Sequence, residues 1–207
     1  MKMKSISVLL TVALVGAMAG TAHAAPIRVY TGSSAWTYGW NTGTNWNPAG
    51  VPVDGDSVVI GGTRRLIVDS STASLGNLYV AYSSNGTTAT QGYLRVYGAP
   101  VYPAYSGVVT ASAIQVAYAG GSTGYIQQLG GTVTATDLWL KYNKGTGAGD
   151  YYLRGGTLTT TNGYIGTNGR STFYHEAGTY NSGVIQLGVY NYTSYGTDSD
   201  VAYYNLT

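Results

Sequence analysis

The sequence predicts an all-β protein, and within that class a right-handed parallel β-helix (β-solenoid) of about 24 residues per coil. Glycines recur about 22 to 25 residues apart, at Gly107, Gly131, Gly156 and Gly178. This spacing is typical of solenoid coils, which bury their apolar faces only by stacking on one another. After residue 25 no helical hydrophobic period is found. Short alternating runs appear instead, separated by Gly, Asn, Ser and Asp, as in strands.

Apolar residues at fixed distances from these glycines strengthen the prediction. They stand two and nine places after each glycine, at Val109, Val133, Leu158 and Tyr180, and at Val116, Leu140, Ile165 and Leu187. An antiparallel sandwich is the alternative all-β solution, but nothing in it requires strands to repeat in register. Parallel coils stack equivalent residues on one another, so the repeated columns favour the β-helix.

Residues 1–24 read as a cleaved signal peptide. Lys2 and Lys4 precede an apolar run at 6–19, and Ala22-His23-Ala24 matches a cleavage site. The protein is therefore predicted to be secreted, to the extracellular space or the outer cell surface. No later stretch is long enough for a membrane-spanning helix, so no membrane span is expected in the mature chain.

Residues 25–56 are predicted to form an N-terminal cap. The block contains Trp36, Trp40 and Trp46 among Gly, Asn and Thr. The open end of a solenoid exposes unpaired backbone groups and interior side chains, which a Trp-rich lid would cover. The alternative is that the three tryptophans form an exposed row that stacks against sugars.

Residues 57–207 are predicted to form the coils, and the four glycines above are expected at their corners, because glycine allows backbone angles that a Cβ obstructs. Insertions are expected at about 97–106 and 189–200, and Tyr190, Tyr192 and Tyr195 in the second are candidate partner contacts. The run at 204–207 resembles 151–154, which precedes a Gly-Gly corner. The last coil is therefore expected to be incomplete, with truncation favoured over a bare end that pairs with another subunit.

The predicted short strands follow the alternating runs in chain order. They are 57–60, 66–68, 78–80, 93–96, 113–116, 125–129, 132–134 and 138–140. In this arrangement tyrosines on the strand before each corner would form ladders on the outside, and like apolar residues would stack in the interior.

The composition excludes several kinds of site. The chain has no cysteine, and His175 is its only histidine after residue 24, so zinc and Cys–His chemistry are not expected. Asp137, Asp150 and Glu176 occupy different places in the repeat and do not form an acid pair for polysaccharide cleavage. Asp54-Gly55-Asp56 is interpreted as a turn in preference to a calcium loop. We expect no catalytic residue, no metal and no cofactor, and the near balance of charge predicts no nucleic-acid partner.

The order of motifs resembles a known family. Trp36, Asn45-Trp46-Asn47, Gly50-Val51-Pro52 and the run 55–60, followed by Gly-Gly-Thr coils, resemble bacterial secreted proteins with autotransporter-associated β-strand repeats, many of them PEP-CTERM-type exported proteins. The resemblance implies a β-helix displayed at or released from the cell surface. We therefore expect a non-enzymatic structural or adhesive protein whose partner is a surface glycan, a protein or another copy of itself in a filament. The alternative is a carbohydrate-binding or polysaccharide-degrading β-helix domain.

Overall fold

The structure is a computed structural model that describes residues 26–82, 90–118, 120–142, 145–167, 169–188 and 202–207. The predicted all-β class is confirmed. The described residues contain no α-helix, and their only helical turn is the 3₁₀ turn η1 (Gly43–Asn45). The predicted signal peptide at 1–24 and the predicted insertion at 189–200 lie outside the described residues.

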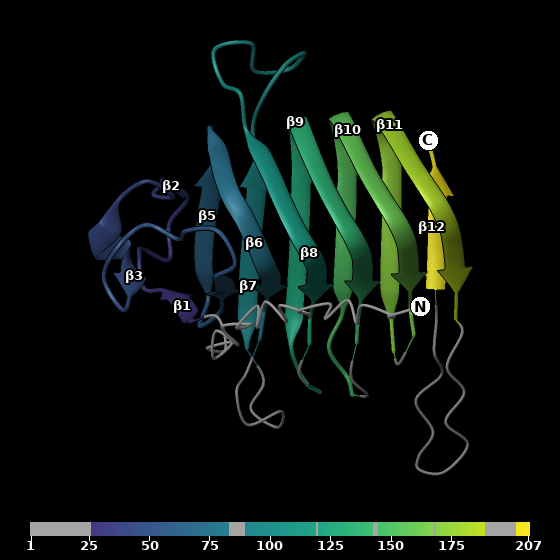
Figure 1. Cartoon of the computed structure of the whole chain (residues 1–207). Helices are drawn as coiled ribbons and strands as arrows, with labels where there is room; N and C mark the ends of the chain where they lie inside the picture. The colour runs from purple at the N-terminus through teal and green to yellow at the C-terminus, as the bar shows by residue number, and fades with distance from the viewer. Residues whose placement is uncertain (1–25, 83–89, 119, 143–144, 168, 189–201) are drawn as a thin grey trace, which may run out of the picture.

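Twelve strands form one curled sheet (Figure 1). All pairings between these strands are parallel except that of β1 with β3, which is antiparallel. The strands are β1 (Ile27–Tyr30), β2 (Thr37–Tyr38), β3 (Trp46–Asn47), β4 (Ser57–Ile60), β5 (Arg64–Val68), β6 (Ser71–Val80), β7 (Gln91–Val96), β8 (Val108–Val116), β9 (Thr123–Leu140), β10 (Gly149–Ile165), β11 (Ser171–Leu187) and β12 (Ala202–Leu206).

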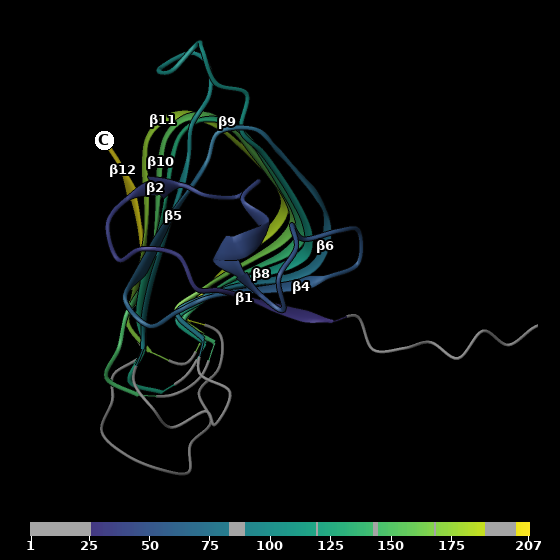
Figure 2. The same cartoon turned by 90° about the vertical axis from the view of Figure 1, so that its left-hand side faces the viewer.

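Three long strands give the sheet its curvature. β9 has 18 residues, and β10 and β11 have 17 each. The first half of β9 pairs with β7 and its second half pairs with β8, so the strand order forks at β9. Seen end-on, these strands wrap around a common interior (Figure 2).

The sequence predicted separate short strands on either side of Gly130-Gly131, and this is wrong in detail. β9 continues through the two glycines, where Gly131 has a φ of 71°, and the strand is bent along its length (Figure 2). The ladder between β9 and β10 shifts register at the bend, between Leu153 and Thr157, and resumes on both sides. The backbone therefore changes direction without ending the strand.

The register agrees with the alignment of the repeat. Val109 pairs with Val133, Val133 with Leu158, and Leu158 with Tyr180. The glycines that anchor the alignment also lie against one another. A Cβ on Gly131 would lie 2.1 Å from the carbonyl oxygen of Gly107, and one on Gly156 would lie 2.2 Å from that of Gly131. The adjacent strands can therefore approach this closely only because these glycines have no side chain.

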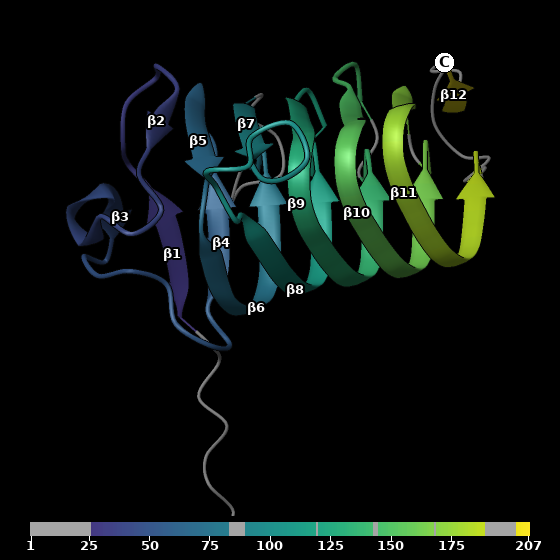
Figure 3. The same ribbon diagram turned by 90° about the horizontal axis from the view of Figure 1, so that it is seen from above.

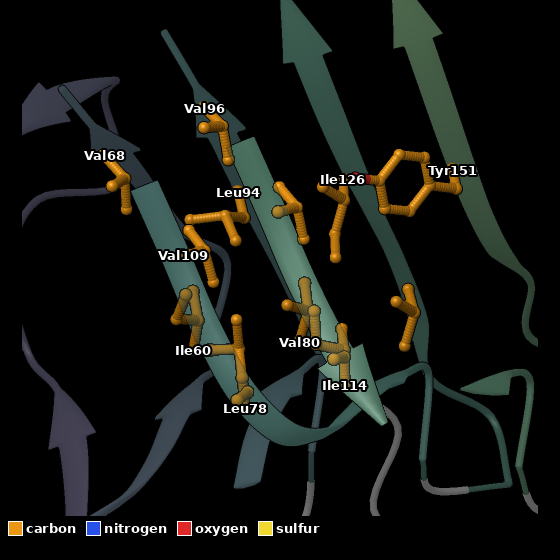
Figure 4. Close-up of a cluster of buried hydrophobic side chains, with 14 of the residues drawn as sticks. Ile60, Val68, Leu78, Val80, Leu94, Val96, Val109, Ile114, Ile126 and Tyr151 are labelled. Atoms are coloured by element: carbon orange, nitrogen blue, oxygen red, sulfur yellow. The ribbon is translucent and has the colours of Figure 1, made fainter. Parts of the chain in front are cut away.

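Alternate residues of each strand point inward and stack in columns. One column joins Leu78, Ile114 and Leu138 through direct strand pairing, and all three side chains are fully buried. A second column contains Leu94, Ile126 and Tyr151. Figure 4 shows members of both columns filling the interior. Burial of this apolar surface is the main source of stability, because the chain has no cysteine to form disulfides.

Several polar side chains are buried, among them that of Gln128 on β9. Gln128 is buried, and its side-chain oxygen accepts a hydrogen bond from the Tyr151 hydroxyl at 2.6 Å. Its amide nitrogen donates to the carbonyl oxygens of Thr157 at 2.9 Å and Gly131 at 3.3 Å. A buried amide is tolerated when its donors and acceptor are satisfied in this way.

β1 and β3 lie at the N-terminal end of the sheet (Figure 3). Two of the three predicted cap tryptophans are buried: Trp46, which belongs to β3, and Trp40, which packs against it. Trp40 and Trp46 are only 1% and 2% exposed, and their rings meet edge to face at 5.1 Å. The indole nitrogen of Trp46 donates a hydrogen bond to the carbonyl oxygen of Trp40 at 2.9 Å. Both belong to the same hydrophobic cluster as the interior columns.

The other end of the sheet is open along most of β11. β12 pairs with β11 only from Ser171 to His175. Ile185 and Leu187 continue two interior columns, because they pair with Gly163 and Ile165 of β10, yet they are 43% and 49% exposed. Among the described residues, no strand covers this part of β11.

Candidate functional site

The first half of each layer presents a polar and aromatic outer surface. β5, β7 and the first halves of β9 and β10 lie side by side. Because side chains alternate along a strand, the neighbours of the buried Leu66, Leu94 and Ile126 point outward. We call the outward group, together with one tryptophan, the arginine–aromatic face. Its members are Trp36, Arg65, Tyr93, Arg95, Tyr125 and Tyr152.

Trp36 reaches this face from the N-terminal block. The guanidinium carbon of Arg95 lies 3.9 Å from the centre of its ring, and the ring of Tyr125 lies 6.4 Å away. Arg95 also donates a hydrogen bond from Nε to the side-chain oxygen of Gln127 at 2.7 Å. Stacking on an aromatic ring and a hydrogen bond together fix the plane of the guanidinium group.

Two more arginines lie over aromatic rings of the same wall. Arg65 is exposed, and its guanidinium carbon lies 5.4 Å from the centre of the Tyr93 ring. Arg154 lies 5.2 Å from the centre of the Tyr152 ring and forms a two-point ion pair with Glu176, at 2.9 and 3.0 Å. The charge of Arg154 is therefore balanced locally, whereas neither Arg65 nor Arg95 forms an ion pair within the described residues.

Asp150 is a carboxylate within this face, because it pairs directly with Tyr125 in the ladder between β9 and β10. It accepts a hydrogen bond from the backbone N–H of Thr172 at 3.0 Å. Burial raises the pKa of Asp150 above its ordinary value of 3.8, although this hydrogen bond and the charge of Arg170 act in the opposite direction. Burial, followed by the charge of Asp150, raises the pKa of the Tyr152 hydroxyl to about 12.

The raised pKa of Asp150 predicts a pH-dependent stability. The folded state holds this proton more tightly than the unfolded state, so the stabilisation that protonation gives is lost as pH rises through the folded-state pKa. Asp150→Asn keeps an acceptor for Thr172 and removes the charge. We expect the variant to be more stable than the wild type near pH 7, with the difference shrinking as pH falls toward 3.8. Urea denaturation across this range measures the effect, and a difference that does not vary with pH would contradict it.

The structure places the other predicted site residues elsewhere. Trp40 and Trp46 are in the core, so the interpretation of these two as exposed sugar platforms is wrong, and only Trp36 is on a surface. The exposed row of tryptophans does not form, because the edge-to-face pair fills the end of the interior. Tyr190, Tyr192 and Tyr195 lie outside the described residues.

The predicted corner glycines lie at the first bend of each layer. Gly131, Gly156 and Gly178 have φ angles of 71°, 76° and 91°, which non-glycine residues rarely adopt. Gly107 does not have a positive φ, and its requirement is space, since a Cβ would lie 2.4 Å from the carbonyl oxygen of Tyr97. The predicted insertion at 97–106 joins β7 to β8 beside this bend and lines a groove of about 760 Å³ with the glycine column as its floor.

The remaining titratable candidates have structural partners. Asp56 pairs with Arg28 and accepts from the backbone of Val53, and Asp54 accepts from the backbone of Ser74. A ring nitrogen of His175 lies 3.0 Å from the Tyr204 hydroxyl oxygen. The described residues contain no group of three or more His, Cys, Asp or Glu side chains able to hold a metal ion.

Sequence reasoning missed the arginines of the face. The alternation of Tyr93-Leu94-Arg95-Val96 could have indicated them, because it places Tyr93 and Arg95 on the side opposite the buried Leu94. That Arg95 meets Trp36 could not be found in this way, because the two residues are far apart in the sequence. The near balance of charge over the whole chain also hid the local grouping of arginines.

Within the described part of the chain, no helix is both long enough and apolar enough to cross a membrane. No protein-family model matches the chain, and neither the curated proteins nor the solved structures contain a match to it.

Proposed function

We propose that the protein is a secreted, non-enzymatic structural or adhesive protein, built as a right-handed parallel β-helix at or outside the cell surface. Parallel pairing in register from β4 to β12 supports the β-helical interpretation. Parallel strands joined by a crossover are nearly always connected with a right-handed turn, which supports the handedness. The resemblance to secreted proteins with autotransporter-associated repeats and the signal-peptide pattern at 1–24 support export.

The observation that carries the structural role is the open edge of β11. Ile185 and Leu187 belong to interior columns but have no layer above them among the described residues. A sheet edge with unpaired N–H and C=O groups beside exposed apolar side chains is a ready template for another strand. A second copy of the chain is the occupant we propose for this edge.

The opposite end of the stack limits this assembly. Trp40, Trp46 and the antiparallel strand β3 already fill it. If only the open edge of β11 is available, both partners must use the same surface. Such an interface closes as a two-fold dimer. We propose this dimer in preference to a long filament.

We expect the purified chain to sediment as a dimer in equilibrium with monomer. Ile185→Lys places a charge at the open end of the interior and should shift the protein to monomer, because a buried unpaired charge opposes association. Val53→Lys introduces the same charge at an exposed valine outside β11, which is 56% exposed, and should leave the dimer intact. Analytical ultracentrifugation over a range of concentrations measures both variants. A wild type that stays monomeric throughout would contradict the assembly.

Export has its own test. Expression of the full chain in a bacterial host, followed by fractionation and N-terminal sequencing, is expected to find a mature protein outside the cytoplasm that starts at Ala25. Retention of an uncleaved chain in the cytoplasm would contradict the proposed localisation.

A second candidate function is carbohydrate binding without cleavage. The observation that favours it is the half-buried Trp36, whose ring lies on the outer wall against Arg95 and near Tyr125. Aromatic side chains with polar neighbours provide both apolar contact and hydrogen bonds for such a ligand. Polysaccharide cleavage has less support, because Asp137, Asp150 and Glu176 each have a separate hydrogen-bond partner.

A further inference from the structure

The arginine–aromatic face combines two chemistries that one class of ligand matches. It runs across adjacent strands, from Arg65 on β5 through Tyr93 on β7 and Tyr125 on β9. A linear polymer lying along the stack would meet these side chains in succession. The ligand must therefore offer repeated apolar surface for the rings and repeated negative charge for the arginines.

Arg65 and Arg95 are prepared to bind carboxylates. Each guanidinium group lies over an aromatic ring, at 5.4 and 3.9 Å from the ring centre, which restricts its orientation before a ligand arrives. Arg95 uses Nε for Gln127, and within the described residues its two terminal nitrogens make no hydrogen bond to another protein group. A planar guanidinium group held in this way presents paired N–H donors that match the two oxygens of a carboxylate.

The local charge is positive although the whole chain is nearly neutral. After Lys2 and Lys4 of the predicted signal peptide are subtracted from the ten basic residues, eight remain, against eight acidic residues. On the face itself, Glu176 is paired with Arg154, and Asp150 is half-buried and accepts a hydrogen bond from the backbone of Thr172. Within the described residues, the charges of Arg65 and Arg95 therefore have no ion-pair partner on the wall.

Nucleic acid fits this face less well. Its binding depends on many phosphate contacts that release counterions, and two unpaired arginines supply few of them. A uronic acid polymer carries one carboxylate on each sugar ring, and each ring also has an apolar C–H surface. We propose that the arginine–aromatic face binds an acidic polysaccharide, a chain of uronate sugars, with Arg65 and Arg95 on its carboxylates and with Trp36, Tyr93 and Tyr125 against its sugar rings. This inference rests on the extracellular, adhesive role proposed above and names its partner.

The test compares polygalacturonate with the same polymer after full methyl esterification, which keeps the sugar backbone and removes the charge. Affinity electrophoresis of the purified chain is expected to give at least about tenfold weaker binding to the ester, since charge-assisted hydrogen bonds contribute most of the difference. Arg65→Gln and Arg95→Gln should each weaken binding to polygalacturonate about tenfold. Ser112→Asp changes the net charge equally at an exposed position outside the face, and it should leave binding unchanged.

Three outcomes would overturn the inference. Equal affinity for acid and ester would show that the carboxylates are not recognised, while leaving carbohydrate binding in place. If Ser112→Asp weakens binding to polygalacturonate as much as the arginine variants do, the effect comes from the overall charge of the protein and not from the arginine–aromatic face. If the chain is folded, as judged by circular dichroism, but does not bind polygalacturonate, the proposed ligand is wrong. The sedimentation of wild type and Ile185→Lys would then test the structural role independently.

Discussion

Gly131→Ala is expected to destabilise the protein by about 4 kcal/mol or to prevent folding altogether. The new methyl group would lie 2.1 Å from the backbone carbonyl oxygen of Gly107, which accepts a hydrogen bond from the backbone N–H of Thr132 at 3.0 Å. The residue also has a φ of 71°, which is unfavourable for any residue with a Cβ. Relief of the clash would require β8 and β9 to separate at the bend, with loss of hydrogen bonds and interior packing.

Gly62→Ala separates the two causes. Gly62 has a similar φ of 63°, but no atom lies within 4 Å of the position that a Cβ would take. This variant should be destabilised only by its unfavourable backbone conformation, by about 1 kcal/mol. Urea denaturation of both variants gives the comparison. Equal losses would mean that contact between the layers at Gly107 and Gly131 is not a determinant of the fold.

Leu138→Ala is expected to cost about 3 kcal/mol. Leu138 is fully buried and lies in register with Ile114, so truncation leaves a cavity in the middle of an interior column. Neighbouring layers cannot collapse into this cavity without disturbing hydrogen bonds along both sides of β9. The remaining structure therefore keeps most of the lost volume empty.

Thr136→Ala is the matched control for this substitution. Thr136 lies two residues earlier on the same strand and is exposed, so its loss should change stability by less than about 0.5 kcal/mol. Thermal or urea unfolding followed by circular dichroism distinguishes the two variants. Similar small effects would indicate that the interior columns contribute little to the stability of the sheet.

The sequence predicted those parts of the fold that depend on the repeat. Equivalent residues such as Val109 and Val133 pair in register because parallel layers place like residues together, and this could be read from spacing alone. The bend at Gly131 followed from the conformational freedom of glycine. The continuity of β9 through that bend did not, since glycine pairs usually indicate the end of a strand.

The N-terminal block was harder to predict because it does not repeat. Trp36, Trp40 and Trp46 stand in similar polar surroundings in the sequence, yet two are buried and one lies on the outer wall. Their different positions arise from contacts with distant residues, such as Arg95 for Trp36. For the candidate surface, the sequence could predict only that Tyr93 and Arg95 lie on the same side of β7. The grouping of arginines and aromatic rings depends on the pairing of strands that are far apart in the sequence.

The unequal lengths of the strand ladders also determine how the molecule would respond to mechanical load. Hydrogen bonds between layers point along the stack, where neighbouring strands are about 4.8 Å apart. β10 and β11 are joined from residue 149 to residue 165 of β10, but β12 is joined to β11 only from residue 171 to residue 175. At the other end, β1 pairs with β4 only from Ile27 to Val29, and β2 pairs with β5 only at Thr37 and Tyr38. Tension along the stack would therefore separate the strands at the two ends first and leave the longer ladders among β9, β10 and β11 intact.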